Sequence, residues 1–284
     1  MSKVAIVTDS TNCLPPEIIE EYGIRVAPYH VIVDGEDYRD QIDITPAEFY
    51  QVFPTLKQLP TTSIPSPGEY TSIFTELAKT TASIVCIIIS KTLSAAYKAA
   101  EEAREIVKAK HPNVNIELID AKNAAGALGF VVLEAARAAR AGKGIAEVIK
   151  TAHDLIPRVK FTAAFDTLKY LIKGGRAPKT AIVGEIMQVK PLIGILDDTG
   201  LVVSVGKERG KQKALQRLVS LIKEHADISK PLHINVHYST YIEDARKLSG
   251  LIKARYNCAE VYITELTPVM TTHTGPSVAL SFYS

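Results

Sequence analysis

Short apolar runs alternate with amphipathic stretches through the first half of the chain. Residues 4–7 and 84–89 are apolar without interruption, which is typical of strands buried on both faces. Polar turns and helical patterns follow these runs, and this repeated order builds doubly wound sheets. The predicted strands cover residues 3–8, 24–33 with a break at Pro28, 84–89 and 114–119. The first half therefore predicts a Rossmann-like α/β domain with a mainly parallel sheet.

The pattern changes after residue 155. Residues 189–196 and 201–207 are strand-like and flank Asp197-Asp198-Thr199-Gly200, which predicts a β-hairpin and hence a mixed sheet. Further strands are predicted at residues 161–165, 233–238 and 259–266 and near the C-terminus, and helices at 167–172, 211–225 and 243–256. We expect two domains, an N-terminal Rossmann-like α/β domain at 1–155 and a C-terminal α/β domain at 156–284.

Composition narrows the class of protein. The net charge of +2 comes from acidic and basic residues mixed along the chain, so nucleic-acid binding has no support. The 3 cysteines are widely spaced, which fits a reduced, cytoplasmic protein and not a disulfide framework or a zinc site. The apolar run at the N-terminus is too short for a signal peptide, and no stretch approaches the ~20 apolar residues of a membrane span.

A hydroxyl-rich stretch lies between two prolines at residues 60–66. Pro60 and Pro65 favour an extended backbone. Ser66 and Glu69 form an S-x-x-E capping box, with proline between them, that predicts the start of a helix. Hydroxyls delivered to a helix N-terminus make a place for an anion. The alternative is a loop followed by a well-capped helix.

A second run of hydroxyl residues follows the apolar run at 84–89. Ligands of open α/β sheets bind outside the carboxyl ends of the strands, so Thr62 and Ser94 are candidates to converge on one small anion. Two hydroxyls would hold a carboxylate without a lysine or arginine. The alternative is a pair of unrelated capping hydroxyls.

Arg176 and His273 are further candidates, each with a structural alternative. A glycine pair ends a predicted helix just before Arg176, which is either an exposed charge or a planar fork for phosphate or carboxylate at a site's rim. His273 lies between threonines ahead of Gly-Pro, in a predicted tight turn, and could act as acid, base or phosphate donor. No phosphate-binding glycine motif occurs, and we expect no metal and no nucleotide cofactor.

Taken together, these motifs resemble those of the DegV family across essentially the whole chain. The residues that carry the resemblance are 8–11, 60–66, Leu93-Ser94 with Tyr97, 167–171 with 174–176, Lys190-Pro191, Lys207 with Arg209, and 273–276. The resemblance implies a two-domain α/β protein that holds a long-chain fatty acid such as palmitate in a tunnel between the domains. It also implies that Thr62 and Ser94 hold the carboxylate.

The same resemblance implies a role as the binding subunit of a bacterial fatty acid kinase. A separate kinase would phosphorylate the carboxylate while the acyl chain stays in this carrier, with Arg176 and His273 serving the transfer. Ser63, His273 and Thr274 would support the carboxylate site. The protein would then be a lipid-binding carrier and not an enzyme, would need no cofactor, and would contact a membrane only transiently to exchange lipid.

The chain departs from the family pattern at several small residues. Alanine replaces the usual glycine, serine or threonine at Ala95, Ala96, Ala121, Ala125 and Ala127, and Ser277 replaces a glycine. Alanine for glycine narrows the space near the acyl tunnel, so the preferred chain length and saturation stay open.

Other functions remain possible on the sequence alone. Ser94, His273 and Asp9 could form the nucleophile, base and orienting acid of an acyl hydrolase, although Ser94 lacks a G-x-S-x-G elbow. A kinase subunit related to dihydroxyacetone kinases would need a nucleotide site, for which the phosphate loops are missing. A ligand-free interaction protein is the third alternative.

Overall fold

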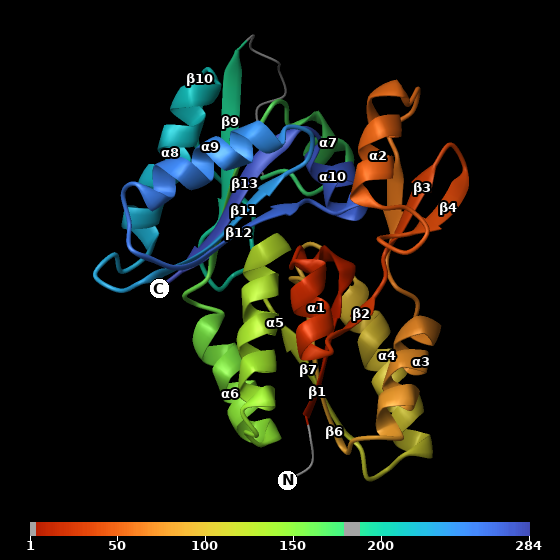
Figure 1. Cartoon of the computed structure of the whole chain (residues 1–284). Helices are drawn as coiled ribbons and strands as arrows, with labels where there is room; N and C mark the ends of the chain where they lie inside the picture. Colours follow the sequence, from red (N-terminus) through yellow and green to blue (C-terminus); the bar gives the residue numbers. More distant parts are fainter. Residues whose placement is uncertain (1–3, 179–187) are drawn as a thin grey trace.

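A four-stranded parallel sheet forms the core of the N-terminal half (Figure 1). The computed structural model describes residues 4–178 and 188–284, and the strands of this sheet lie in the order β2-β1-β6-β7. Their bounds are β1 (Val4–Asp9), β2 (Arg25–Ala27), β6 (Ser83–Ile88) and β7 (Asn115–Asp120). Every residue of β6 is buried, which explains its nearly continuous apolar run. The predicted parallel sheet is confirmed.

Helices cover both faces of this sheet, with α3 and α4 on one face and α5 and α6 on the other (Figure 1). The helices of this half are a 3-10 turn (Ser10–Asn12), α1 (Pro16–Tyr22), α3 (Pro67–Ala78), α4 (Ala96–Lys110), α5 (Ala125–Arg140) and α6 (Ile145–Leu155). The predicted capping box begins α3: Glu69 N donates to Ser66 Oγ at 3.2 Å, and Ser66 N donates to the Glu69 carboxylate at 2.7 Å.

A small antiparallel sheet of order β4-β3-β5 stands beside the parallel one. It contains β3 (His30–Val33), β4 (Glu36–Arg39) and β5 (Thr61–Ser63), and α2 (Pro46–Val52) and a 3-10 turn (Phe53–Thr55) lie between β4 and β5 in the chain. Residues 24–33, predicted as one broken strand, are instead two strands in two sheets. The break at Pro28 lets the chain leave one sheet for the other.

Six strands form the mixed sheet of the C-terminal half, in the order β10-β9-β8-β13-β11-β12. They are β8 (Lys160–Phe165), β9 (Val189–Ile195), β10 (Val203–Arg209), β11 (Leu232–Tyr238), β12 (Cys258–Glu265) and β13 (Ser277–Tyr283). β9 and β10 form the predicted antiparallel hairpin, and β11 and β12 pair in parallel. The predicted mixed sheet is confirmed.

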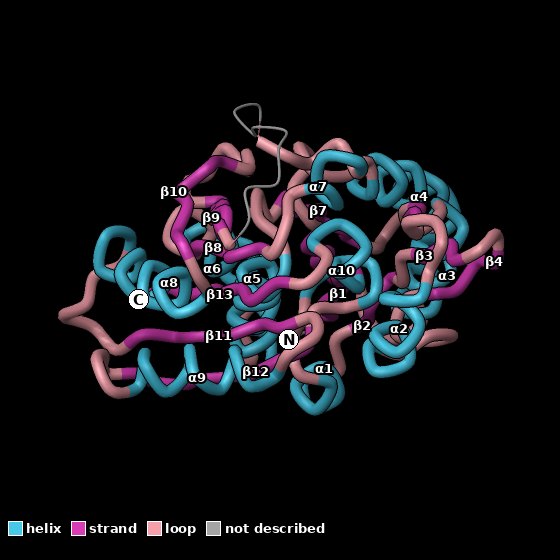
Figure 2. Tube along the Cα trace, turned by 90° about the horizontal axis from the view of Figure 1, so that it is seen from above, coloured by secondary structure: helices cyan, strands magenta, loops and turns pink. Residues whose placement is uncertain are grey.

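Two helices cover the outer face of the mixed sheet, α8 (Lys211–His225) and α9 (Ile242–Lys253). Figure 2 shows α9 running alongside β11 and β12, while β8 and β13 contact α5 from the opposite face. Neither these nor any other helix within the described residues combines the length and the apolar character needed to cross a membrane.

The two halves meet in a close and largely buried contact. One apolar cluster includes residues of both halves, from Val4 on β1 to Tyr283 on β13. A Cβ on Gly126 of α5 would lie 2.5 Å from the ring of His237, so only glycine fits there. Burial lowers the pKa of His237 to about 3, so this contact is neutral.

All strands of the parallel sheet precede Leu155, and all those of the mixed sheet follow it. The domain boundary itself stays a prediction.

Candidate functional site

A cavity lies between the two halves and is lined by residues of both. Its volume is about 730 Å³ when the open space at its mouth is included. Most of its wall is apolar, and the C-terminal half contributes Phe161 and Phe165 from β8, Ile193 and Ile195 from β9, and Val202. Apolar walls with a few polar groups are typical of sites for small organic ligands.

Four polar side chains in the cavity wall form two hydrogen-bonded pairs. Thr62 Oγ1 and His273 Nε2 lie 2.9 Å apart, and Ser94 Oγ and Tyr29 OH lie 2.5 Å apart. Thr62 projects from β5, and Ser94 lies just before α4. The fold thus brings together the two hydroxyls for which the sequence predicts a common anion, and Thr274 lines the same cavity.

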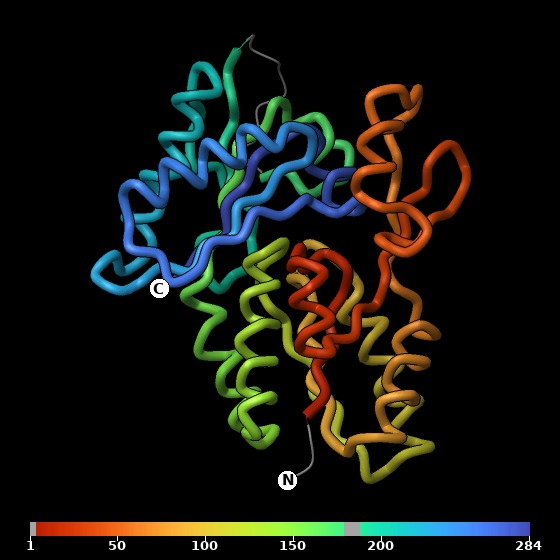
Figure 3. Tube along the Cα trace, viewed as in Figure 1, coloured from red at the N-terminus to blue at the C-terminus, as the bar shows by residue number. Residues whose placement is uncertain are grey.

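His273 reaches this cavity from a helix, which corrects the predicted tight turn. It lies in the last turn of α10 (Pro268–Thr274), which is capped by the Thr267 side chain and begins with Pro268. The turn follows only at Gly275, whose φ is 61°. α10 lies beside the small sheet that carries Thr62 (Figure 3).

The imidazole of His273 is neutral and tightly enclosed. Burial, together with the positive charge of Arg176, lowers the pKa of His273 to about 4. A Cβ on Gly174 would lie 2.5 Å from His273 Nδ1. Gly174 therefore does more than end α7 (Lys169–Lys173), because it also leaves the space that the ring occupies.

Arg176 also lines the cavity, with its guanidinium fixed by two backbone carbonyls. Its Nε donates to Leu93 O at 3.1 Å, next to Ser94, and Nη1 donates to Gly174 O. Arg176 makes no ion pair with a described carboxylate, and its charge lowers the pKa of His273 nearby. The cavity that contains the two hydroxyls thus also contains a guanidinium, and the expectation that hydroxyls alone hold the anion stays a prediction.

Two parts of the predicted anion site lie elsewhere. Ser63, the next residue on β5, is exposed and does not line the cavity, because side chains alternate along a strand. The N-terminus of α3 does not line it either: the Ser66 hydroxyl and the Glu69 carboxylate already accept its amide protons. These two amide groups are therefore not available to an anion.

The hydrogen bonds of the described residues do not assemble the hydrolase alternative. Ser94 is bonded to Tyr29 and His273 to Thr62. The fully buried carboxylate of Asp9 accepts from Thr11 N at 3.0 Å and from Ile89 N at 2.9 Å, which ties the ends of β1 and β6 together. A Ser94–His273–Asp9 relay would need a different set of contacts.

Tyr29 is a cavity residue that sequence reasoning missed. It lies between β2 and β3, and its side chain is buried against the cavity. Its local sequence looks like that of any core tyrosine. Only the passage of the chain from one sheet to the other, at Pro28, brings its hydroxyl to Ser94.

One side-chain cluster has the composition of a metal site. Ligand atoms of Glu134, His233 and Glu260 lie within 4.8 Å of one another. Arg137, however, donates to the Glu134 carboxylate at 2.6 Å and to both oxygens of Glu260 at 3.0 and 2.6 Å. The guanidinium already supplies the positive charge, and this cluster joins α5 to the mixed sheet as an ion-pair network.

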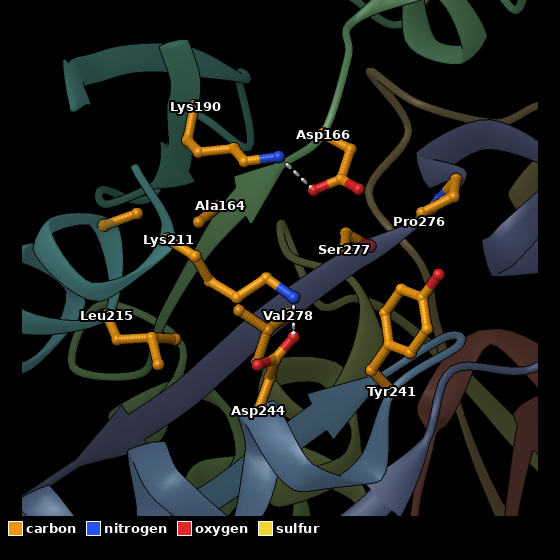
Figure 4. Close-up of a pocket in the computed structure, with 11 residues that line it drawn as sticks. Ala164, Asp166, Lys190, Lys211, Leu215, Tyr241, Asp244, Pro276, Ser277 and Val278 are labelled. Atoms are coloured by element: carbon orange, nitrogen blue, oxygen red, sulfur yellow. Dashed lines mark hydrogen bonds and ion pairs between the residues drawn. The ribbon is translucent and has the colours of Figure 1, made fainter. Parts of the chain in front are cut away.

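A second, smaller pocket lies on the C-terminal half and contains more charge than the cavity (Figure 4). Lys190 Nζ lies 2.7 Å from Asp166 Oδ1, and Lys211 Nζ lies 2.7 Å from Asp244 Oδ2. The floor between them is apolar and includes Val278. Each lysine is matched by a carboxylate, so no net charge points to a ligand here.

Known proteins resemble this chain over its whole length. The model described as "Uncharacterised protein, DegV family" matches residues 3–284. The chain belongs to the DegV family. A DegV domain-containing protein of Caldanaerobacter subterraneus is 31% identical over 284 residues, which is 100% of this chain and 99% of that relative. Another, of Staphylococcus aureus, is 33% identical over 276 residues, 97% and 96% of the two chains. The resemblance inferred from the motifs is confirmed.

Solved structures of the DegV family share the fold described above. A DegV family protein of Thermus thermophilus, described as fatty acid binding, superposes with a TM-score of 0.91 at 27% identity and covers 100% of both chains. DegV of Bacillus subtilis, a fatty acid binding protein, gives 0.88 at 28% identity over 100% and 99% of the chains. A stearic acid-binding protein of Eubacterium ventriosum gives 0.88 at 26% identity over 100% and 98%.

Proposed function

We propose that this protein binds a long-chain fatty acid in the cavity between its two halves. The observation that carries the proposal is an apolar cavity whose polar lining residues include two hydrogen-bonded pairs, Thr62 with His273 and Ser94 with Tyr29. The similarity to DegV proteins described as fatty acid binding supports it. Thr62 and Ser94 bind the carboxylate, and the chain extends between the apolar walls.

The affinity comes mainly from the acyl chain. Burial of a sixteen-carbon chain at ~0.8 kcal/mol per methylene is worth on the order of 10 kcal/mol before the costs of ordering and association. The hydroxyls orient the head group. The guanidinium of Arg176 at the same end, which makes no ion pair with a described carboxylate, favours a negatively charged ligand.

We further propose that the protein presents the carboxylate to a separate fatty acid kinase. A carboxylate oxygen attacks the γ-phosphorus of ATP on the kinase, the bond between that phosphorus and the ADP oxygen breaks, and acyl phosphate and ADP form. Arg176 and His273 steady the charge that develops on the phosphoryl group. The protein acts as a cytoplasmic carrier that meets a membrane briefly when lipid is exchanged.

Titration of the delipidated protein with palmitate tests the binding site. Thr62→Val and Ser94→Ala should each weaken binding by about 1–3 kcal/mol, the usual loss for a hydrogen bond to a charged group. Ser63→Ala is the matched control, because Ser63 is the neighbouring hydroxyl on the exposed side of β5. If Thr62→Val, Ser94→Ala and the control all bind palmitate like the parent, the carboxylate lies elsewhere.

Phosphorylation by the cognate kinase tests the carrier role. Arg176→Ala and His273→Ala should retain lipid, with a loss of affinity of no more than about fivefold, since neither residue contacts much of the chain. Both should lose at least about tenfold in ADP release. Arg246→Ala, at an exposed arginine on α9, is the control. Variants that lose lipid and turnover together would make these residues structural. ADP release by the wild-type protein without a kinase would make the protein an enzyme and overturn the carrier role.

A further inference from the structure

Tyr29 has a place in the cavity that fatty acid binding alone does not explain. Only 5% of its surface is exposed, and its hydroxyl lies 2.5 Å from Ser94 Oγ. We propose that Tyr29 is a positioning residue for the carboxylate: its hydroxyl donates to Ser94 Oγ, and Ser94 in turn donates its own proton to the ligand. This inference rests on the proposed function and adds a residue that discriminates a carboxylate from an uncharged head group.

The number of hydrogen bonds that the Ser94 hydroxyl can make indicates that Tyr29 donates to Ser94 and not the reverse. Its hydroxyl has one proton and two lone pairs, and one lone pair accepts from Ala96 N at 3.2 Å. A phenol is a stronger donor and a weaker acceptor than an alkyl hydroxyl, so the Tyr29 proton goes to the second lone pair. Only the Ser94 proton is then left for a partner, and a carboxylate is an acceptor only. Hydrogen bonds in such a chain strengthen one another.

Tyr29 is suited to be a fixed donor. Burial raises its pKa well above the ordinary value, an effect that the Asp9 charge increases, so the hydroxyl keeps its proton. Its backbone is held on both sides: Tyr29 N donates to Ser10 Oγ at 3.1 Å, and Asp40 N donates to Tyr29 O at 2.8 Å. The hydroxyl is therefore in position before a ligand arrives, and its ordering costs nothing at that point.

The other hydroxyl of the site has an equivalent partner. His273 is neutral and lies 2.9 Å from Thr62 Oγ1; in the tautomer that has its proton on Nε2, it donates to Thr62 and leaves the Thr62 proton for the ligand. Each carboxylate-binding hydroxyl thus has its own donor. On one side the hydroxyl lies on β5 and the donor on α10; on the other side the hydroxyl lies just before α4 and the donor lies between β2 and β3.

A double-mutant cycle with two ligands tests the inference. Palmitate and hexadecanol have the same chain length, and both displace one fluorescent fatty acid from the delipidated protein. Tyr29→Phe keeps the ring. It should lower the affinity for palmitate about three- to tenfold and change the affinity for hexadecanol less than about twofold. Tyr29→Phe combined with Ser94→Ala should bind palmitate like Ser94→Ala alone, because Tyr29 acts through Ser94. Tyr70→Phe is the control, since its hydroxyl is buried outside the cavity wall with no hydrogen-bond partner among the described residues.

The other outcomes separate this inference from the proposed function. An unchanged ratio of palmitate to hexadecanol affinity in Tyr29→Phe would reduce Tyr29 to a packing residue. A double variant weaker than Ser94→Ala by the full Tyr29→Phe factor would mean direct contact between Tyr29 and the ligand, and would overturn the relay. Wild-type protein that binds neither ligand would overturn the proposed function and this inference with it.

Discussion

The interdomain cavity and the pocket on the C-terminal half differ in how their polar groups are satisfied. In the cavity, Arg176 makes no ion pair with a described carboxylate, and Tyr29 and His273 stand behind two hydroxyls. In the pocket, Lys190 and Lys211 each have a carboxylate 2.7 Å away. The pocket has more formal charge, yet its charges already bind one another.

This difference shows what marks a binding site in this fold. Charged side chains around a hollow often form surface ion pairs, which contribute little to stability or recognition. A guanidinium at an apolar wall that has no carboxylate partner among the described residues leaves room for a negatively charged ligand.

Obstruction of the cavity should have the largest effect. Val202→Trp places an indole in the apolar part, and we expect palmitate affinity to fall at least about 1,000-fold because chain burial dominates binding. Val203→Trp is the matched control, since Val203 is exposed and does not line the cavity. Displacement of a fluorescent fatty acid measures both. Equal affinities for palmitate would mean that the chain binds elsewhere.

Asp40, which accepts a hydrogen bond from the cavity-lining residue Val269, is another charged group that makes no ion pair with a described residue. It is fully buried: Oδ1 accepts from Val269 N of α10 at 3.2 Å, while no hydrogen bond of ordinary geometry from the described residues reaches Oδ2. Burial raises the pKa of Asp40 from 3.8 to about 7, although the nearby Ser10 hydroxyl offsets part of this rise. The folded state therefore binds a proton between pH 4 and 7 that the unfolded chain has lost, so this stabilisation is full below pH 4 and is lost as the pH rises through 7.

Asp40→Asn should remove this pH dependence. Ionisation of Asp40 should lower the free energy of unfolding of the parent by roughly 2–4 kcal/mol between pH 5 and pH 8. The amide cannot ionise, so the variant should not show this loss. Urea unfolding of both proteins at the two pH values measures the difference. The same change between the two pH values in parent and variant would show that Asp40 does not carry the buried charge.

A single methyl group next to His273 should have a smaller but definite effect. Gly174 has an ordinary helical backbone, so Gly174→Ala brings no backbone strain, only a Cβ that would lie 2.5 Å from His273 Nδ1. Displacement of the ring breaks its bond to Thr62, and palmitate affinity should fall by about 1 kcal/mol, or fivefold. Gly250→Ala on α9, where a Cβ meets nothing within 4 Å, is the control. Unchanged binding by Gly174→Ala would separate His273 from the head group.

The pocket on the C-terminal half should respond least. Lys190→Ala removes one partner of an exposed ion pair, and we expect a loss of stability below about 1 kcal/mol and no change in palmitate affinity. Thermal unfolding and the same displacement assay measure these effects. A tenfold loss of palmitate affinity would show that the pocket belongs to the ligand site after all.

Most of the fold could be predicted from local patterns. Apolar runs such as β6, the capping box at Ser66 and Glu69, and the turn of the β9–β10 hairpin each specify their element through near neighbours in the sequence. The helix that bears His273 also has a start signal in the sequence, Thr267 followed by Pro268. The Gly-Pro pair after the helix is a turn signal, and the sequence prediction gave it more weight. The prediction of a turn at His273 failed for that reason.

The site was predictable only in part. Thr62 and Ser94 stand in hydroxyl-rich motifs that can be recognised without the fold. Tyr29 and the position of Arg176 depend on long-range contacts: the passage from β2 to β3 in one case, and the carbonyls of Leu93 and Gly174 in the other. Contacts of this kind leave no periodic pattern in the sequence.

Mass spectrometry of lipid released from the purified protein under denaturing conditions tests the central claim most directly. We expect a fatty acid of about 16–18 carbons, at up to about one molecule per chain, because the burial of each methylene group in the apolar cavity stabilises the complex. Val202→Trp prepared in parallel should release little or none, and Val203→Trp should match the parent. Repeated preparations that release no lipid and do not take up added palmitate would contradict the account.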